Sequence, residues 1–359
     1  MFFGANIAEG FRDPGFGTAV EWDVPLLEGY DHEFLPALAS GEITSVRPLN
    51  WGIGRRLKQG AFDVLWVHGY TRLASLSGIL AAKRLGLKVM VRDEANGGAP
   101  RRSVARAGAR RLFYAALTRM ADAFLAIGTL NREYYRRLGI AADRIFSVPY
   151  AVDNAFFRER AIYAGRRREE LRRELGLTAG RAVILFSGKL VPRKGPMLLA
   201  EAYQQLSRDG RSEPEPYLLF AGDGELRGAI EKMAADLGWR SMRVLGFRNQ
   251  TALPAFYDLC DVFVMPSVVE PWGLVVNEAM NAGRAVIVSD LAGCSPDLVR
   301  DGVNGFIFKA GDVADLSRVL RATLTDPQRR TEMGLRSLEI IARWSFEEDV
   351  RGLRAALDI

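Results

Sequence analysis

Residues 262–280 read VFVMPSVVEPWGLVVNEAM. The stretch begins with a short apolar run typical of a buried strand and passes through a loop into a predicted helix over 274–282. Glu270 lies in the loop and Glu278 in the first turns of the helix, so both carboxylates can face the carboxyl edge of the sheet. Paired carboxylates suit the hydroxyls of a sugar. Two glutamates at this spacing are common by chance. The pair is evidence for a sugar site only because it lies in a strand-loop-helix segment.

The same alternation of short apolar runs and longer amphipathic stretches extends along the whole chain. It predicts βαβ units with parallel sheets. The first half has candidate strands at 63–67, 88–91, 123–127 and 144–148, and candidate helices at 71–86, 102–119 and 130–138. The second half has candidate strands at 182–187, 217–221, 242–246, 262–266, 285–289 and 305–308, and candidate helices at 196–207, 225–237, 251–259, 274–282, 313–325 and 328–342. The second half is therefore expected to form a second sheet.

The length of 359 residues exceeds that of one ordinary hydrophobic core, so two domains are expected. A polar stretch at 156–181 predicts a linker with a charged helix, which separates a first domain at 1–155 from a second at 182–342. The expected architecture is α/β, with two doubly wound, Rossmann-like domains and a cleft between them. Ligands of such sheets bind beyond the carboxyl ends of the strands.

The composition excludes several classes of protein. With 48% hydrophobic and 26% charged residues, the chain is not mainly disordered. Two cysteines and two histidines make neither a disulfide framework nor a Cys/His metal site, which predicts a reducing compartment and a cytoplasmic protein. The longest apolar runs have about a quarter of the length of a membrane span. The first residues lack the pattern of a secretory signal.

The net charge of +6 lies in the first half, where residues 1–160 carry 22 Lys and Arg against 16 Asp and Glu. Six arginines crowd one predicted helix: Arg101, Arg102, Arg106, Arg110, Arg111 and Arg119. A basic amphipathic helix suits an anionic membrane surface, whereas the alternative is a solvated face whose apolar side packs on the sheet. No nucleic-acid partner is expected, because no aromatic interleaving or reader motif accompanies the charge.

The turn after the strand at 182–187 has the chemistry of a diphosphate cradle. Residues 188–195 read GKLVPRKG, with three cations within six residues. Gly188 lets the backbone approach a ligand, and the N-terminus of the following helix adds partial positive charge. An ordinary basic surface turn explains this segment equally well. It is not a Walker loop, because the chain has no Gly-x-x-x-x-Gly-Lys-Ser/Thr run.

These turns, together with GDGEL at 222–226, VLGF at 244–247 and DGVNG at 301–305, resemble the retaining glycosyltransferases of family 4, which have the GT-B fold. The resemblance covers most of the chain. It implies metal-independent transfer of a hexose-type sugar from a nucleotide-diphosphate sugar, bound by the second domain as a substrate rather than a cofactor, to the hydroxyl of a saccharide or lipid-linked saccharide. From the resemblance and the basic first domain we expect a role in polysaccharide or glycolipid synthesis, in a cytoplasmic protein that is peripheral at the inner membrane face. Residues 343–359 are similar to the family's closing helix, which returns to the first domain.

The resemblance also assigns roles residue by residue. It implies catalytic or diphosphate-holding roles for Lys189, Lys194 and Glu270, an acceptor-side role for Arg92, and donor-binding roles for Gly188, Gly246, Phe247, Trp272, Gly273, Leu274 and Glu278. Glu278 would hold the ribose hydroxyls, and Glu270 with the backbone of 272–274 the donor sugar. Glu94 is expected beside Arg92 on the acceptor side. We expect Lys194 and Glu278 to be exposed in the cleft rather than packed.

Three departures from the family pattern are visible. Lys189 stands where an arginine is usual, and it lacks the bidentate fork of a guanidinium. No histidine follows the strand that ends at Val91, and His68 is either its substitute or a structural residue. The family's first strand and glycine-rich loop are not recognised, so the first domain is expected to lack them.

Two rival functions follow from other features. The glycines of 221–228 suggest a dinucleotide-binding dehydrogenase, but their spacing is one residue too long for Gly-x-Gly-x-x-Gly and they fall in a later unit. A catalytically impaired GT-B protein that binds nucleotide or glycan without turnover is the alternative suggested by the shortened start.

Overall fold

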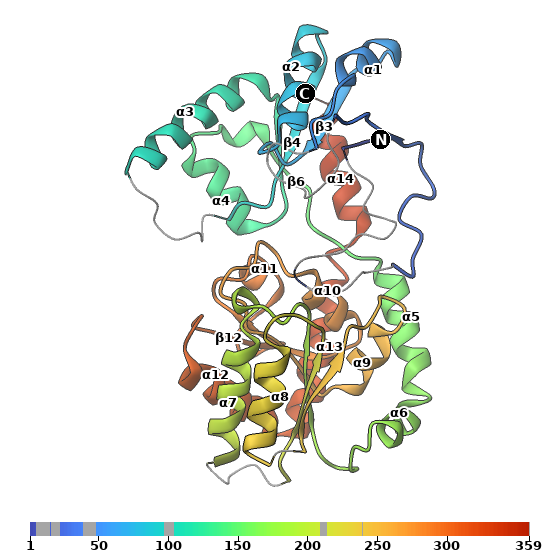
Figure 1. Cartoon of the computed structure of the whole chain (residues 1–359), viewed down its shortest axis with the longest axis vertical. Coiled ribbons are helices and arrows are strands. Elements are labelled where there is room, and N and C mark those ends of the chain that lie inside the picture. Colours follow the sequence, from blue (N-terminus) through green and yellow to red (C-terminus); the bar gives the residue numbers. More distant parts are fainter. Residues whose placement is uncertain are drawn as a thin grey trace. The chain divides into compact units, whose positions relative to one another are not determined.

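The computed structural model describes residues 1–4, 15, 22–38, 48–96, 104–208, 214–238 and 240–358, and for 104–107 and 109–111 only the backbone (Figure 1). The chain divides into two compact units. The first comprises Met1–Phe11, Pro25–Pro149 and Glu347–Ile359, and the second Arg12–Val24 and Tyr150–Phe346. The predicted basic residues Arg101 and Arg102 lie outside the described residues, as do the side chains of Arg106, Arg110 and Arg111.

The first unit is built on a four-stranded parallel sheet in the order β3-β4-β5-β6. Its strands are β3 (Val64–His68), β4 (Lys88–Arg92), β5 (Ala123–Ala126) and β6 (Ile145–Ser147), beside a short parallel pair of β1 (Phe2–Phe3) and β2 (Glu33–Phe34). Its helices are α1 (Ile53–Gln59), α2 (Leu73–Arg84), α3 (Val104–Met120), α4 (Thr129–Arg137) and α14 (Phe346–Leu357), with a 3-10 turn η1 (Ala142–Arg144). The sequence therefore predicts all four strands of this sheet to within two residues.

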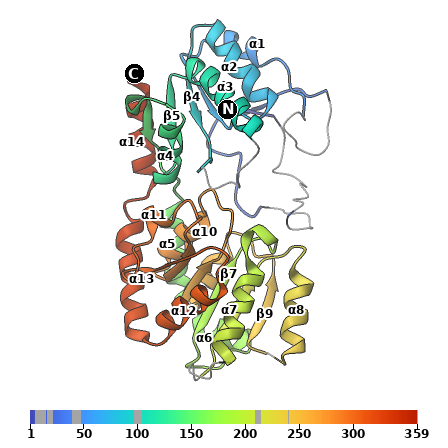
Figure 2. The same ribbon diagram turned by 90° about the vertical axis from the view of Figure 1, so that its left-hand side faces the viewer.

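Both faces of this sheet are covered, which is why its strands read as continuous apolar runs. Successive side chains of a strand point to opposite faces. Val89 and Val91 of β4 pack with α2 and α3, while Met90 between them packs with Leu353 and Ala356 of α14. The returning helix expected within 343–359 thus closes the second face of the first sheet, as Figure 2 shows.

The second unit contains a six-stranded parallel sheet in the order β12-β11-β10-β7-β8-β9. The strands are β7 (Val183–Ser187), β8 (Tyr217–Ala221), β9 (Met242–Gly246), β10 (Val262–Met265), β11 (Ala285–Ser289) and β12 (Gly305–Phe308). The helices are α5 (Asn154–Gly165), α6 (Arg168–Glu174), α7 (Pro196–Arg208), α8 (Arg227–Asp236), α9 (Leu253–Leu259), α10 (Leu274–Asn281), α11 (Ser295–Leu298), α12 (Val313–Leu324) and α13 (Pro327–Ile341), with a 3-10 turn η2 (Pro192–Lys194). All six strands predicted from the second half are present.

The second sheet is also covered on both faces. Alternate residues of the central strands, such as Ile184 and Phe186 of β7, form a buried core with helices α7, α8 and α12. Helices α9 and α10 pack against the strands β7, β10 and β11. The direction change lies between β7 and β10, where the strand order reverses, and a ligand of a doubly wound sheet binds at such a point.

The stretch at 156–181 is not an isolated linker in the structure. Asp153 accepts a hydrogen bond from the backbone N–H of Phe156 and so caps the start of α5, whose Phe157 is buried. Helices α5 and α6 both pack on α9, and Arg168 of α6 pairs with the buried carboxylate of Asp258. The structure therefore places this stretch within the second unit, because its apolar side chains are buried there.

Candidate functional site

The turn after β7 is held against the turn after β8 by its backbone. The N–H of Gly188 donates to the carbonyl of Ala221 at 3.0 Å, and the N–H of Leu190 donates to the carbonyl of Asp223 at 2.8 Å. Leu190 is fully buried and anchors the turn. Lys189 is half-buried between these two anchored positions. The basic turn predicted from sequence is therefore a fixed element at the carboxyl ends of two neighbouring strands.

Gly195 brings the same turn against the loop that follows β10. Its φ of 68° lies in the left-handed region, and a Cβ on it would lie 2.3 Å from the carbonyl oxygen of Pro266. The N–H of Val268 donates to the carbonyl of Arg193 at 2.9 Å across the same contact. Only glycine permits this approach without strain, and it sets Lys194 beside the loop of Glu270.

Strained backbone alone costs about 1–3 kcal/mol. Replacing Gly195 with alanine is expected to lower the free energy of unfolding by more than this. The excess arises because the new methyl group meets backbone, which cannot move aside as a side chain can. Gly180 is a matched control, since its φ is 77° and nothing lies within 4 Å of a Cβ there. Urea unfolding of both alanine variants measures the difference, and equal losses would contradict the close contact at Pro266.

Lys194 and Glu270 form an ion pair through the Nζ and Oε2 atoms. The side chains are 20% and 8% exposed, so the pair is largely removed from water yet reachable from it. The hydroxyl of Ser267 lies 3.4 Å from the same carboxylate oxygen. Lys194 and Glu270 are 76 positions apart in the sequence. The structure thus brings together two residues that the sequence analysis selected. A carboxylate with so little solvent needs the neighbouring cation.

Glu278 is buried, which corrects the expectation that it is exposed. Its residue is 7% exposed, and the hydroxyl of Tyr257 on α9 donates to its Oε2 at 2.6 Å. Burial raises the pKa of the Glu278 carboxyl to about 7, while the Tyr257 hydrogen bond favours the ionised form and opposes part of the rise. Glu278 is buried because it lies on the face of α10 that packs against α9.

Trp272 contributes its backbone to the loop, while its side chain is turned inward. The residue is 2% exposed, and its indole Nε1 donates to the side-chain oxygen of Asn277 at 3.0 Å. Gly273 follows with a φ of 106° and precedes Leu274, where α10 begins. Asn277 and Tyr257 are residues that the sequence analysis missed, because nothing in their local pattern distinguishes them from core residues.

The end of β9 carries the other predicted donor-binding residues. Gly246 has a φ of 77° and forms a bridge with Gly222, so the turns after β8 and β9 meet. Phe247 is half-buried there. Beside them, Asp223 pairs with Arg227 at 2.9 Å. Residues 222–224 thus serve as packing between strand ends.

Arg92 lies at the carboxyl end of β4 in the first unit and is 5% exposed. Its Nη2 donates to the carbonyl of Val148 at 3.0 Å and lies 3.3 Å from the Asp349 carboxylate of α14. The nearby His68 is exposed as a whole residue, but its ring is partly covered because it stacks on Trp66. Partial burial and the positive charge of Arg92 lower the pKa of His68 to about 4. His68 is therefore neutral at pH 7.

The comparisons with known proteins agree with these features. A family model described as glycosyl transferases group 1 matches residues 167–338, and a second, described as glycosyl transferase 4-like domain, matches residues 13–151. The chain belongs to the group 1 glycosyltransferases.

Relatives of this group 1 glycosyltransferase include the D-inositol 3-phosphate glycosyltransferase of Nocardia farcinica, 32% identical over 62% of this chain and 49% of that protein. The alpha-D-kanosaminyltransferase of Streptomyces kanamyceticus is 29% identical over 60% of this chain and 54% of its own length. A lipopolysaccharide core biosynthesis glycosyltransferase, LpsE of Rhizobium meliloti, is 34% identical over 49% of each chain. The chain spans about half the length of the curated relatives it matches.

Solved structures show the GT-B fold for this glycosyltransferase. Anabaena Alr3699/HepE in complex with UDP has a TM-score of 0.70 at 18% identity, over 86% of this chain and 82% of that one. A sucrose-phosphate synthase from Thermosynechococcus elongatus has a TM-score of 0.65 at 21% identity, over 85% of this chain and 73% of that one.

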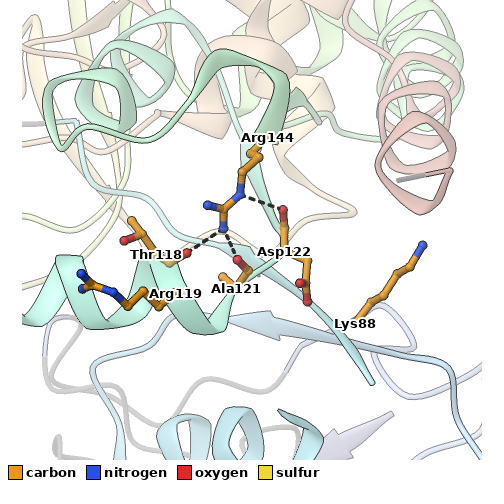
Figure 3. A pocket seen from close by; sticks show the side chains of 6 residues that line it. All are labelled: Lys88, Thr118, Arg119, Ala121, Asp122 and Arg144. Atoms are coloured by element: carbon orange, nitrogen blue, oxygen red, sulfur yellow. Dashed lines mark hydrogen bonds between the residues drawn. The ribbon is translucent and has the colours of Figure 1, made fainter. Parts of the chain in front are cut away.

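A second feature of the glycosyltransferase lies at the amino edge of the first sheet. A hollow of about 540 Å³ is lined by Lys88, Thr118, Arg119, Ala121, Asp122 and Arg144. Figure 3 shows Arg144 above the end of α3, where its guanidinium donates to the carbonyls of Thr118 at 2.7 Å and of Ala121. This arrangement caps the C-terminus of α3, which carries partial negative charge. The sequence analysis did not find the hollow, because it joins the ends of three separate elements.

No helix among the described residues combines the length and the apolar character that a bilayer crossing requires. In the same part of the chain, no group of three or more His, Cys, Asp or Glu side chains is placed to share a metal ion.

Proposed function

We propose that the chain transfers a sugar from a nucleotide-diphosphate sugar to an acceptor hydroxyl, with retention of anomeric configuration and without a metal ion. The observation that carries this proposal is the Lys194–Glu270 ion pair in the turns that follow the central strands β7 and β10, with the buried Glu278 on the helix after the second turn. A cation next to a carboxylate suits a substrate that presents a diphosphate next to sugar hydroxyls.

Each residue of this site then has a chemical task. Negative charge develops on the diphosphate as the bond to the sugar breaks, and a cation fixed before the reaction stabilises that charge more than the ground state. Lys194 and Lys189 supply the positive charge, from a turn already held by Leu190 and Gly195. Glu278 accepts hydrogen bonds from the ribose, and Glu270 from the sugar. The backbone N–H groups at the start of α10 add partial positive charge.

The relatives support the substrate class. The Anabaena protein was solved with UDP and with UDP-glucose. By this likeness, we propose a nucleotide-sugar donor and a saccharide or lipid-linked saccharide acceptor. The name of the Rhizobium relative supports a role in cell-surface polysaccharide or glycolipid synthesis. The low cysteine count is consistent with a cytoplasmic place for this work.

Thermal unfolding with UDP, GDP and ADP and their sugar conjugates tests the donor site. A ligand present at about 100 times its dissociation constant stabilises the folded chain by about 2.7 kcal/mol. We expect one nucleotide to stabilise the chain more than the other two, and its sugar conjugate to be consumed when an acceptor is supplied. A chain that melts cooperatively and responds to none of them would contradict the proposal and favour the catalytically impaired alternative.

We further propose that the end of α3 meets an anionic membrane surface. Leu112 is 75% exposed, and Arg119 lies on the same helix face two turns later. The one carboxylate that lines the hollow, Asp122, is already paired with Lys83 at 3.0 Å. Lys88 and Arg119 therefore add positive charge that this carboxylate does not neutralise.

The double variant Lys88→Glu/Arg119→Glu is expected to bind phosphatidylglycerol vesicles about tenfold or more weakly than the unchanged chain. The reason is that each basic residue near an anionic surface contributes about 1 kcal/mol. Co-sedimentation at low salt measures the binding. The matched control is Lys58→Glu/Arg84→Glu, which makes the same charge change on exposed residues of α1 and α2. Equal losses in both double variants would show that only net charge matters and would contradict a surface at α3.

A further inference from the structure

Tyr257 of α9 is fully buried, yet it carries a polar hydroxyl. Its ring meets Phe263 of β10 edge-on, with ring centroids 5.7 Å apart. A phenylalanine ring would pack in the same way, and a buried phenol O–H is costly unless it is hydrogen-bonded. The Tyr257 hydroxyl donates to Oε2 of Glu278 at 2.6 Å. Its bond to this carboxylate therefore explains the tyrosine better than packing does.

Helix α9 holds the Tyr257 hydroxyl in a fixed place. Asp258, the next residue, pairs with Arg168 of α6 and, at 3.2 Å, with Arg284. These two ion pairs anchor the helix beside Tyr257. The side chain of Ser187, the last residue of β7, hydrogen-bonds to the same hydroxyl. Tyr257 thus links α10 to the strand end from which the basic turn starts.

The Tyr257 hydroxyl stays a hydrogen-bond donor at every pH near neutrality. Burial and the neighbouring Glu278 raise its pKa well above the usual value of 10. The Glu278 carboxyl, in contrast, has a pKa of about 7, because burial raises it and the Tyr257 hydrogen bond lowers it. A hydrogen bond donated to a carboxylate favours the ionised form. Tyr257 therefore increases the fraction of Glu278 that is ionised at neutral pH.

The charged groups on the elements around α10 do not account for this titration. Strands β10 and β11, which pack on α10, contain no charged residue. On α9, Asp258 is bonded to the two arginines already named. Helices α5 and α13 also pack on α10 and carry charged residues, but within the described part of the chain none of their charges shifts the pKa of Glu278. Tyr257 is thus the polar side chain that acts on this carboxyl.

We propose that Tyr257 is a positioning residue for the nucleotide, whose hydroxyl holds the Glu278 carboxylate in the ionised form that accepts hydrogen bonds from the ribose. This inference rests on the proposed donor site and adds a residue that acts through Glu278. A carboxylate has about four acceptor positions on its two oxygens, so the ribose can donate to Glu278 while Tyr257 holds Oε2. Protonation would convert one of these oxygens into a donor and weaken the remaining acceptor.

Tyr257→Phe tests this role, because it removes one oxygen atom and keeps the ring. The probe is whichever of UDP, GDP and ADP stabilises the unchanged chain most, and calorimetry from pH 5.5 to 9 measures its affinity for both chains. Titration of the ligand affects both chains alike. The midpoint is the pH at which half of the gain in affinity is reached. It is expected at about 7 for the unchanged chain and about one pH unit higher for the variant, the shift that a hydrogen bond to a charged group produces.

The expected loss of affinity therefore depends on pH. With its midpoint one unit higher, the variant binds about fivefold more weakly at pH 7 and within about twofold of the unchanged chain at pH 9. Tyr203→Phe is the matched control. Tyr203 is also fully buried in the second unit, and its hydroxyl donates to the carbonyl of Pro216 at 2.7 Å. This control is expected to lower the melting temperature but to keep the midpoint of the unchanged chain, as a merely structural role would.

A double variant shows whether Tyr257 acts through Glu278. In a chain that already carries Glu278→Gln, adding Tyr257→Phe is expected to change the nucleotide affinity by less than about twofold at any pH, because the titrating group is gone. Two residues that contribute independently would show the same loss in both backgrounds.

A second measurement needs no substitution at Tyr257. The infrared carboxylate absorption of the unchanged chain minus that of Glu278→Gln gives the pH at which Glu278 titrates, and it is expected at about 7. A Glu278 carboxyl that stays protonated above pH 9 would overturn the proposal even if the phenylalanine variant failed to fold.

The failure of this inference and that of the proposed function are distinguishable. If the nucleotide binds but Tyr257→Phe keeps the midpoint of the unchanged chain, or if its loss is the same with and without Glu278→Gln, the role of Tyr257 is overturned and the donor site stands. If none of the three nucleotides binds the unchanged chain, the proposed function fails and this inference fails with it.

Discussion

Replacing Lys194 with alanine is expected to slow sugar transfer by about 100- to 1,000-fold, the range found when one preorganised group that stabilises transition-state charge is removed. The ion pair with Glu270 places this ammonium where the diphosphate is proposed to bind. The loss should fall on kcat as well as on nucleotide affinity, because charge on the leaving group is greatest in the transition state. Initial rates with the donor identified by thermal unfolding measure it.

The substitution also removes the cation next to Glu270, which is 8% exposed, so circular dichroism and the melting temperature must show that the variant is folded. Lys194→Arg keeps the charge and is expected to recover part of the rate. Lys232→Ala, on the exposed face of α8, removes one positive charge elsewhere and should leave the rate unchanged. Normal turnover by a folded Lys194→Ala chain would refute the assignment.

Glu278→Gln is expected to weaken nucleotide binding by about tenfold or more at pH 8, because one strong acceptor for the ribose hydroxyls is replaced by a neutral amide. Glutamine is preferred to alanine here, since it leaves a partner for the buried hydroxyl of Tyr257. The residue is packed, so an alanine would add a cavity and an unpaired hydroxyl to any effect on binding.

The pH dependence gives the sharper test of Glu278. Its pKa is raised to about 7, and donation by ribose hydroxyls favours the ionised form. Nucleotide affinity should therefore rise with pH through about 7 and fall by up to about tenfold per pH unit below it. The contribution of this group to folding has the opposite sign, since it is fully present below the ordinary pKa of 4.5 and is lost as pH rises through about 7. Calorimetric titrations from pH 5.5 to 8.5 measure the binding profile. An unchanged profile in Glu278→Gln would exclude this carboxyl as its source.

The strands and the turns after them are well predicted from sequence, because parallel strands buried on both faces are apolar throughout and glycine marks the close turns. The contact of Lys194 with Glu270 follows from the same logic. Each residue comes after a central strand, and strand order in a doubly wound sheet brings β7 next to β10. Local pattern and sheet topology together suffice for that part of the site.

Burial by distant elements is what the sequence does not predict. Glu278 is hidden because α9, some twenty residues away, presents Tyr257 to it, and Trp272 turns inward because Asn277 accepts its N–H. The basic turn around Lys189 and the strand end at Arg92 look alike in sequence, as cations after apolar runs. Arg92, however, bonds to Val148 and to Asp349, which is 257 positions away. Such partners are set by tertiary packing and leave no local signal.

The packing of α5 and α6 on α9 fixes where this protein can be cut and recombined. A chimera that exchanged donor specificity with a relative by joining at residue 182 would separate Arg168 from Asp258 and uncover Phe157. Junctions at Tyr150 and Phe346 keep those contacts inside one exchanged block. They also leave Arg92 and Asp349 together in the recipient, so the ion pair between these two residues is kept. The larger part of the natural module, residues 150–346, therefore begins some thirty residues before the sheet it carries, and residues 12–24 belong to the same unit.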